Sequence, residues 1–414
     1  MPTESHTPNV NAAPNRVAVR VTPDALRRIR GGHPWVFDRS IRSVDPIGRA
    51  GDLAVVFDER KRFAAVGLFD PEAPIAIRVL HHGVPTPIDA AWIRERMVDA
   101  CALRRSLVRA MTRASTDAPS AGYRVVNGEN DGLGGLVIDR YADVLVVKIY
   151  TAAWIPWLEA VIDGALEVTG VGTVVVRRAR HVVDGPADGS VVAGGLEDPV
   201  VRFGEWGLDL EADVVRGQKT GYFLDQRANR RRIGGLADGA AVLDVFAATG
   251  GFGAHAAAGG AASVHSIDAS GPTLAVAERN VGRNATERAF VHATEVGDAF
   301  DALRGLRRAG RRFDVVVVDP PAFAQRAADV ERAARAYDRL ARLALDVTAP
   351  GGVLMLASCS SRVSASRFFE TVAPRVAERG GREIARTGHD TDHPVTFPEG
   401  EYLKAGFWRL PAQL

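Results

Sequence analysis

Short apolar runs alternate with segments of helical periodicity throughout the chain after about residue 206. Most of these runs lack the apolar–polar alternation of a strand with one exposed face. They read AAVLDVF (240–246), SVHSID (263–268), AFVHA (289–293), FDVVVVD (313–319) and GVLMLAS (352–358). Strands that are buried on both faces and separated by helices are typical of a parallel sheet with helices on both sides. Residues 206–414 are therefore predicted to form a Rossmann-like α/β domain with a mostly parallel, doubly wound sheet.

The sequence before residue 206 has two further patterns. Residues 16–82 contain short strands separated by turns with charged residues or proline, and a short helix that is expected to stop at Gly31-Gly32, which predicts a small β-rich module. After a linker at 81–89 comes a helical pattern at 90–111, and residues 88–205 as a whole mix strands with helices. This region is predicted to be an α+β middle domain. Residues 1–15 are expected to form a disordered tail.

Composition restricts the class of protein. The chain has 414 residues and a net charge of +2, so its overall charge does not point to a polyanionic partner. Its two cysteines cannot form a disulfide framework, and no Cys/His pair has zinc spacing. No run approaches the ~20 apolar residues of a membrane span. We therefore expect a cytoplasmic protein with no metal site and no membrane segment.

A glycine turn and two acids point to a cofactor site. Ligands of a doubly wound sheet bind at the carboxyl ends of its strands, where Gly250 and Gly251 follow the first strand and Asp268 ends the second. Asp268 is placed to accept hydrogen bonds from ribose hydroxyls, and Asp298, after the third strand, to accept one from an adenine amino group. The turn lacks the G-x-G-x-x-G spacing of a dinucleotide site. S-adenosylmethionine is therefore the expected cofactor, and a nicotinamide oxidoreductase is disfavoured.

The fourth run ends in Asp319, followed by Pro320 and Pro321. Each proline disfavours the helical conformation at the residue before it, which holds the carboxylate on a stiff, extended turn. Nucleobase amino-methyltransferases carry an acid or Asn followed by two prolines and usually an aromatic residue, and Phe323 lies close behind here. Asp319 is predicted to hold the base, with Pro320, Pro321 and Phe323 as substrate-binding residues.

Cys359 follows the fifth run, and Ser361 or Ser364 is expected to cap the helix after it. A cysteine just before a helix N-terminus is biased towards the thiolate. Addition of a thiolate to C6 of cytosine makes C5 an enamine-like carbon that can attack a methyl sulfonium, whereas an exocyclic amine needs no such partner. Cys359 is therefore predicted to be a nucleophile, while Cys101 lies in a helical apolar pattern and is expected to pack.

Eight stretches carry a resemblance to a known family. They are GGHPWVFDRSI (31–41), YRVVNGENDGLGGLVIDRY (123–141), GQKTGYFLDQRANR (217–230), FAATGGFG (246–253), SIDAS (266–270), DPPAF (319–323), SCSS (358–361) and DHPVTFPEGEYLKAGF (392–407). In these stretches the sequence resembles the PUA-domain-containing 23S ribosomal RNA cytosine-5 methyltransferases. The likeness covers nearly the whole chain after the tail.

The resemblance implies an RNA-binding PUA-like module at 16–82, a middle domain at 88–205 and a methyltransferase domain at 206–414, with ribosomal RNA as the partner and a homodimer left open. It implies Cys359 and Asp319 as the catalytic pair. The S-adenosylmethionine-binding residues are then Lys219, Tyr222, Asp225, Gln226, Arg227, Gly250, Gly251, Phe252, Asp268, Asp298 and Asp319. Relatives often carry Lys at the position of Ala322, and another class of RNA cytosine-5 methyltransferases has a second cysteine at the position of Pro321. A single-cysteine mechanism is implied, with Asp319 or a water removing the C5 proton.

Arginines are concentrated near the N-terminus. Between Arg16 and Arg42 there are seven arginines and two aspartates, a balance that suits contact with RNA phosphates. The predicted phosphate-binding side chains are Arg20, Arg27, Arg28, Arg30, Arg39 and Arg42.

Two other functions remain open from the sequence. A guanine or exocyclic-amine methyltransferase of the same fold would share the Asp-Pro-Pro turn but not the strand-end cysteine. A catalytically inactive RNA-binding or ribosome-assembly protein would not need Asp268, Asp298, Asp319 and Cys359 together.

Overall fold

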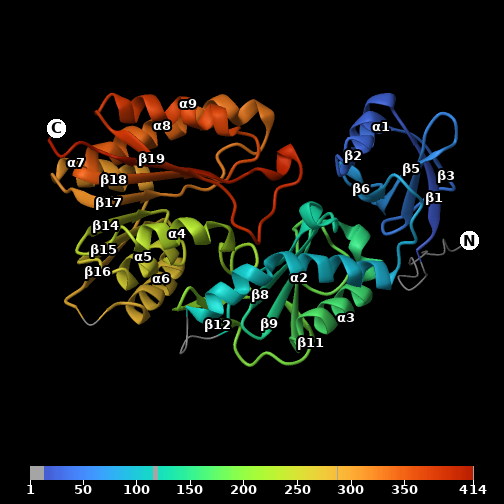
Figure 1. Cartoon of the computed structure of the whole chain (residues 1–414), viewed down its shortest axis with the longest axis horizontal. Helices are drawn as coiled ribbons and strands as arrows, with labels where there is room; N and C mark the ends of the chain where they lie inside the picture. Colours follow the sequence, from blue (N-terminus) through green and yellow to red (C-terminus); the bar gives the residue numbers. More distant parts are fainter. Residues whose placement is uncertain (1–13, 115–119, 287, 414) are drawn as a thin grey trace, which may run out of the picture. The chain divides into compact units, whose positions relative to one another are not determined.

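The computed structural model describes residues 14–114, 120–286 and 288–413 (Figure 1). The predicted tail, residues 1–15, lies outside the described residues except for its last two. The chain folds as two compact units. The first comprises the residues up to Ser106 together with Tyr123–Pro199 and Val214–Arg216, and the second comprises Leu107–Gly122, Val200–Asp213 and the chain from Gly217 onward.

The first unit begins with a six-stranded sheet in the order β2-β6-β5-β4-β1-β3. Its strands are β1 (Arg16–Val21), β2 (Trp35–Phe37), β3 (Ile41–Asp45), β4 (Leu53–Phe57), β5 (Phe63–Phe69) and β6 (Ile75–His82). The helix α1 (Pro23–Arg30) is capped by Thr22 and ends at Gly31, as the sequence predicted. Its buried Ala25 and Ile29 pack on one face of the sheet against a core that includes Val19.

A five-stranded sheet in the order β11-β10-β9-β8-β7 completes the first unit. Its elements are α2 (Ala90–Arg113), β7 (Tyr123–Asn127), β8 (Leu136–Tyr141), β9 (Val144–Ile149), α3 (Leu158–Thr169), β10 (Thr173–Arg178) and β11 (Ser190–Ala193). The predicted helix from residue 152 begins as a 3₁₀ turn, Ala152–Trp157, and becomes α-helical only from Leu158. Pro156 lies inside that turn and has no N–H to donate, which fits the late start of the α-helix.

Polar contacts join the two sheets of the first unit. The Trp35 indole Nε1 and the Arg78 guanidinium Nη1 both donate to Glu129 Oε1, at 2.8 and 2.6 Å. The Trp157 Nε1 donates to the Gly51 carbonyl at 2.8 Å. The β-rich module and most of the middle domain are thus two sequence segments of one compact unit.

The second unit is built on a seven-stranded sheet in the order β16-β15-β14-β17-β18-β20-β19. The strands are β14 (Ala241–Val245), β15 (Ser263–Asp268), β16 (Val291–Val296), β17 (Phe313–Val318), β18 (Thr348–Ser358), β19 (Arg382–Thr387) and β20 (Lys404–Arg409). Strands β14 to β18 pair in parallel, and β20 runs antiparallel to both β18 and β19. The mostly parallel, doubly wound sheet is confirmed, whereas β19 and β20 were not predicted.

Helices cover both faces of this sheet: α4 (Arg227–Gly234), α5 (Gly251–Ala258), α6 (Gly271–Arg283), α7 (Ala299–Arg308), α8 (Val330–Val347) and α9 (Ala365–Ala377). Figure 1 shows α8 and α9 on one side and α5 and α6 on the other. Neighbouring residues of β14 enter opposite cores, since Leu243 packs with α7, α8 and α9 and Val242 packs with α4 and α5. The continuous apolar runs follow from this two-sided burial.

The hairpin of β12 (Val200–Glu205) and β13 (Leu208–Asp213) belongs to the second unit. The predicted boundary at residue 206 therefore cuts through a hairpin. Within the described residues, no helix is long and apolar enough to cross a membrane.

Candidate active site

Two predicted site residues meet at the carboxyl edge of the second unit's sheet. Asp319 follows β17 and Cys359 follows β18, and these strands are parallel neighbours, so their ends lie side by side. The Cys359 Sγ lies 3.7 Å from Asp319 Oδ1, a distance at which a thiol donates to a carboxylate. Both side chains are only partly accessible. The site therefore holds a thiol and a carboxylate in direct contact.

A third side chain lies against this pair. The Gln226 amide Nε2 is 3.9 Å from Cys359 Sγ and also hydrogen-bonds the Asp319 carboxylate. The Gln226 Oε1 accepts from Asn229 Nδ2 at 2.6 Å, and Asn229 Oδ1 accepts from Thr387 Oγ1 at 2.6 Å. This chain fixes which end of the amide faces the sulfur. Gln226 thus lies beside the Cys359 sulfur, and its expected place in the cofactor pocket stays a prediction.

The loop that carries Cys359 is tied to its neighbours. The Ser360 Oγ donates to the Ala324 carbonyl at 3.0 Å, which links this loop to the Asp-Pro-Pro segment. The buried Lys404 donates from Nζ to the carbonyl oxygens of Ser360 and Val363. Neither Ser360 nor Lys404 was predicted from the sequence as a site residue. The only signal for Lys404 was the scarcity of lysine, since the chain has four.

Burial changes the protonation of the site. It raises the pKa of the Cys359 thiol well above its usual range, and the adjacent Asp319 raises it further. The predicted bias towards the thiolate is therefore wrong for the protein alone: α9 begins at Ala365, capped by Ser364, too far along the chain to offset the loss of water. Burial, together with Asp225, raises the pKa of Asp319 to about 7. Burial lowers the pKa of Lys404 to about 8.

The segment before α4 supplies a polar group beside the catalytic pair. The buried Asp225 accepts from Lys219 Nζ at 3.1 Å and from the Tyr402 hydroxyl at 2.9 Å, both at Oδ2. The Lys219 ammonium also lies over the Phe223 ring, 4.6 Å from its centroid. Lys219 and Asp225 thus form an ion pair that is exposed at the lysine end and buried at the carboxylate end.

The predicted cofactor residue Arg227 lies in a buried cluster of charged groups. Its fully buried guanidinium donates to Asp392 at 2.8 Å and to the Gly122 carbonyl at 3.0 Å, and lies 3.3 Å from Glu205. Glu205 also accepts two 2.7 Å hydrogen bonds from Arg230. Burial alone would raise the pKa of Glu205, but Arg230, His255 and Arg227 together outweigh burial and hold the pKa of this carboxyl below its usual range. The donors of Arg227 thus serve this buried cluster, and its expected contact with the cofactor stays a prediction.

The glycine turn after β14 has a left-handed backbone at alternate residues, with φ of 64° at Phe246, 47° at Ala248 and 75° at Gly250. The Ala248 N–H donates to Asp268 Oδ2 at 3.0 Å, and the Ser270 N–H donates to Oδ1 at 2.9 Å. Asp268 is therefore held in place by the turn itself. Each of its oxygens keeps a second lone pair for a ligand.

The glycines of this turn are needed for close packing of the protein. A Cβ on Gly250 would lie 2.7 Å from Ala277, and one on Gly251 would lie 2.3 Å from the Tyr222 hydroxyl oxygen. Tyr222 itself is buried, edge-on to Phe203. The Phe252 ring packs in the core of the α5 face. These glycines are predicted to let a ligand approach the backbone closely, and their packing against the protein also requires small residues at 250 and 251.

Two further acids differ in environment. Asp298 is exposed and caps α7, accepting from Phe300 N and Asp301 N at 3.0 and 3.1 Å through Oδ1. Asp244, which the sequence reading missed, is fully buried, and burial followed by Asp319 and Asp268 raises its pKa to about 7. Its Oδ2 accepts from Gly253 N at 3.1 Å, while the buried Oδ1 has no hydrogen-bond partner among the residues that the structure describes. The signal in the sequence was an acidic residue inside the apolar run AAVLDVF (240–246), where a carboxylate would have to be buried.

The predicted base-binding segment is partly solvent-facing. Pro320 is buried, Pro321 is exposed and Phe323 is half-buried. The Phe323 ring lies 5.1 Å from that of Tyr337, whose hydroxyl donates to Ser358 Oγ at 2.8 Å. This packing couples the Asp-Pro-Pro turn to the end of β18.

The predicted RNA-binding arginines lie in the first unit and are exposed. Arg27 and Arg28 each approach Asp24 at 3.2 Å, and Arg30 approaches Asp58 at 2.9 Å. Arg20, Arg39 and Arg42 are likewise on the surface. Among the residues that the structure describes, no three His, Cys, Asp or Glu side chains are grouped so that they could hold a metal ion.

Comparison with known families gives two matches. Residues 133–380 match the S-adenosylmethionine-dependent methyltransferases, and residues 19–82 match a PUA-like domain. A protein of Deinococcus radiodurans named ribosomal RNA large subunit methyltransferase is 46% identical over 403 residues, covering 95% of this chain and 98% of that protein. A ribosomal RNA large subunit methyltransferase I of Shewanella denitrificans is 34% identical over 94% of this chain and 98% of its own.

Solved structures share the fold over nearly the whole chain. A Streptococcus mutans protein described as an S-adenosylmethionine-dependent methyltransferase superposes with a TM-score of 0.80 over 95% of this chain and 100% of its own, at 18% identity. A crystal structure in complex with SAH also superposes with a TM-score of 0.80, at 19% identity over 96% of this chain.

Proposed function

This chain belongs to the family of S-adenosylmethionine-dependent ribosomal RNA large subunit methyltransferases, and we propose that it methylates C5 of a cytosine in 23S ribosomal RNA through a covalent adduct of Cys359 with C6. The observation that carries this proposal is the contact of 3.7 Å between Cys359 Sγ and Asp319 Oδ1. A methyltransferase of an exocyclic amine has no use for a thiol at this position. An enzyme that acts on ribosomal RNA in this way works in the cytoplasm.

The side chains of the second unit suit S-adenosylmethionine. When bound, this cofactor supplies a methyl group on a positively charged sulfur. Asp268 would accept from the ribose hydroxyls, and Asp298 retains an oxygen for an adenine amino group. Among the described residues the buried Asp244 Oδ1 has no hydrogen-bond partner, so it adds an acceptor, and the Asp225 carboxylate adds negative charge, which suits a cationic ligand. Lys219, Tyr222 and the turn at Gly250-Gly251 would complete the pocket, with the Phe252 ring packing behind it.

Asp319 activates the thiol in this proposal. Because the resting Cys359 is protonated, attack needs an acceptor for its proton, and Asp319 Oδ1 is in contact with the sulfur. As the S–C6 bond forms, the thiol proton passes to Asp319, which then donates it to N3 of the cytosine. The C5–C6 π pair becomes the enamine pair that attacks the methyl group from C5.

The same residues would complete the reaction. After methyl transfer, the C5 proton must leave and the C6–S bond must break, with the electron pair of the C5–H bond restoring the C5–C6 double bond. The deprotonated Asp319 or a water that it orients accepts this proton, and Cys359 departs as a thiolate. The proton on N3 then returns to the Cys359 sulfur, which restores the neutral base and the resting thiol. Gln226, held by Asn229, would keep the sulfur facing C6 throughout.

Each of the three predicted domains would have its own role in the reaction. Residues 206–414, with β12, would carry out methyl transfer, and the middle domain, 88–205, would connect them to the PUA-like module at 16–82. The exposed arginines of that module, listed above, would contact RNA phosphates. The Asp-Pro-Pro turn, with Pro320, Pro321 and Phe323, would line the site of the unstacked base, whose removal from a helix costs about a few kcal/mol.

An RNA substrate that contains 5-fluorocytosine tests the mechanism. Fluorine cannot leave C5 as a proton does, so the wild type should form a protein–RNA adduct that survives denaturation and depends on S-adenosylmethionine. Cys359→Ala should lose both the adduct and methylation while it still binds the cofactor by calorimetry. Cys101→Ala, the matched control, should form the adduct normally. Methylation without an adduct in the wild type, or activity in Cys359→Ala, would refute cytosine-5 chemistry and favour a guanine or amino-group target.

A further inference from the structure

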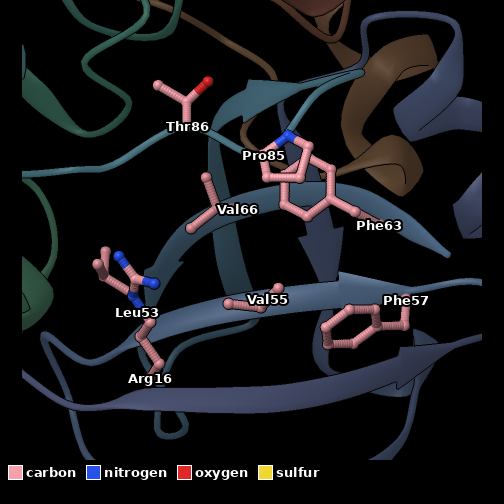
Figure 2. Close-up of a pocket in the computed structure, with 8 residues that line it drawn as sticks. All are labelled: Arg16, Leu53, Val55, Phe57, Phe63, Val66, Pro85 and Thr86. Atoms are coloured by element: carbon pink, nitrogen blue, oxygen red, sulfur yellow. The ribbon is translucent and has the colours of Figure 1, made fainter. Parts of the chain in front are cut away.

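The β-rich module has an apolar hollow on one face of its sheet. Its volume is about 270 Å³, and Figure 2 shows Val55, Phe57, Phe63 and Val66 of β4 and β5 lining it, with Pro85 and Thr86 of the following segment. The rings of Phe57 and Phe63 are half-buried. An apolar recess with aromatic rings at the surface is a feature of binding sites rather than of ordinary solvated strands.

This hollow is on the face that α1 does not cover. Val17 and Val19 of β1 and Val56 of β4 point into the core beneath α1. Side chains alternate along a strand, so Arg16, Val55 and Phe57 point to the other face.

The strand register places cations beside the aromatic rings. Arg20 of β1 pairs with Phe57 of β4, which in turn pairs with Phe63 of β5. One row across this face therefore reads arginine, phenylalanine, phenylalanine. Arg16 pairs with Leu53 in another row and lines the hollow directly.

The charge of the module favours an anionic partner. Residues 16–82 contain twelve Arg and Lys and eight Asp and Glu, a net charge of +4, whereas the whole chain has +2. The turn between Phe57 and Phe63 adds the exposed Arg60, Lys61 and Arg62, and its Asp58 is engaged by Arg30 and Arg62. A protein partner would gain from the apolar surface alone, but this cationic rim complements a phosphate backbone.

We propose that the hollow binds an unstacked base of single-stranded ribosomal RNA, with the base against Phe57 and Phe63 and its phosphates near Arg16 and Arg20. Aromatic side chains on an open sheet face with flanking arginines are the chemistry that stacks single-stranded bases. A paired helix would present only its backbone to such a face. The proposal rests on the proposed function in that RNA is the substrate, and it adds a second point of base recognition away from Cys359.

Leucine substitutions test the hollow in the full-length protein. Phe57→Leu and Phe63→Leu keep an apolar side chain but remove the ring, so each should weaken binding of a fluorescent single-stranded oligocytidylate about fivefold or more at fixed salt. Binding of the same strand annealed to its complement should not change. Arg16→Gln should reduce the slope of log affinity against log salt by about one. Phe37→Leu, which changes another exposed aromatic residue of the module, is the matched control and should bind as the wild type does.

Phe57→Trp reports RNA binding at the hollow directly, through tryptophan fluorescence, and does not rely on a loss of affinity. Its fluorescence should be quenched on addition of the single strand and unchanged by the duplex. Wild-type affinity in both leucine variants, or equal losses for single strand and duplex, would overturn the proposal. So would a change in sedimentation from dimer to monomer in Phe57→Leu, which would assign this face to a second copy of the chain.

Failure of this proposal is distinguishable from failure of the proposed function. If the hollow binds a base, Phe57→Leu should need a higher RNA concentration than the wild type to reach half of its own maximal rate of 5-fluorocytosine adduct formation. If the wild type forms no adduct but the leucine variants still lose single-strand affinity, only the proposed cytosine-5 mechanism is refuted. If the wild type forms the adduct and the leucine variants bind single-stranded RNA normally, only the proposed base-binding role of the hollow is refuted.

Discussion

The Gln226 amide nitrogen lies 3.9 Å from the Cys359 sulfur, although the two residues are 133 positions apart in the chain. This contact joins the segment before α4 to Cys359 at the end of β18. Because Asn229 occupies the other end of the amide, Gln226 can only present its N–H groups to the sulfur and to Asp319. We infer that Gln226 positions the nucleophile.

Replacing Gln226 should therefore affect catalysis more than cofactor binding. Gln226→Ala should lower the single-turnover rate of methylation about tenfold or more, the scale of one lost hydrogen bond to a charged group. Cofactor affinity by calorimetry should change less than twofold, since the amide faces the sulfur. Gln218→Ala, at a nearby exposed glutamine, should behave as the wild type. A large loss of cofactor affinity in Gln226→Ala would instead return this residue to the cofactor pocket.

Asp319 should control the pH dependence of the reaction. Burial raises its pKa to about 7, and only the ionised carboxylate can accept the thiol proton. The single-turnover rate at subsaturating RNA should therefore rise with pH and level off above about 7. Asp319→Asn should lose methylation. Asp314→Asn, at the start of the same strand, should keep both the activity and the pH profile. A rate that falls as pH rises through 7 would contradict Asp319 as the acceptor.

Asp268 should contribute to cofactor affinity. Asp268→Ala removes the acceptors proposed for the ribose hydroxyls and should weaken S-adenosylmethionine binding by about 1–3 kcal/mol. The variant should also loosen the turn at Ala248, so Asp268→Asn, which keeps one acceptor, should fall between it and the wild type. Asp301→Ala, an exposed control, should have no effect. Calorimetry with unchanged affinity in Asp268→Ala would show that the cofactor lies elsewhere.

Asp244 should make the protein less stable as pH rises. Its pKa is raised from 3.8 to about 7 in the fold, so between these values the native state binds a proton that the unfolded chain has released. The free energy of unfolding must then decrease as pH increases through this window, by no more than about 4 kcal/mol for this group. Asp319 acts in the same direction.

Urea unfolding at pH 5 and pH 8 tests this. Asp244→Asn keeps an acceptor for Gly253 and has no charge to bury, so it should lose less stability between the two pH values than the wild type. Equal losses in the two proteins would show that Asp244 is ionised in the fold at both pH values.

The arginines of α1 should contribute to RNA affinity through phosphate contacts. For the full-length protein, Arg28→Gln should weaken binding similarly for different RNA sequences and reduce the salt slope by about one. Arg28 is more than half exposed and shares Asp24 with Arg27, so it is free to reorient towards a phosphate. Arg379→Gln, on the second unit, serves as the control. An unchanged slope in Arg28→Gln would remove that residue from the interface.

The sequence by itself determined the elements that depend on local patterns. The continuous apolar runs located β14 to β18, and a parallel sheet brings the ends of its strands to one edge, so Asp319 and Cys359 had to lie near each other. The cap at Ser364 and the stop at Gly31 likewise follow from residues close in the chain.

Only the tertiary structure decided the environment of these groups. The pKa of Cys359 depends on burial by many residues that are distant in the chain. This burial raises the pKa, whereas the nearby helix N-terminus suggested by the local sequence would lower it. The local sequence suggests that Arg227 binds a ligand. In the fold, Glu205 and Asp392, which are distant in the chain, form ion pairs with it. Strand positions are fixed by short-range periodicity, whereas pKa values and hydrogen-bond partners are set by which segments the folded chain brings together in the absence of water.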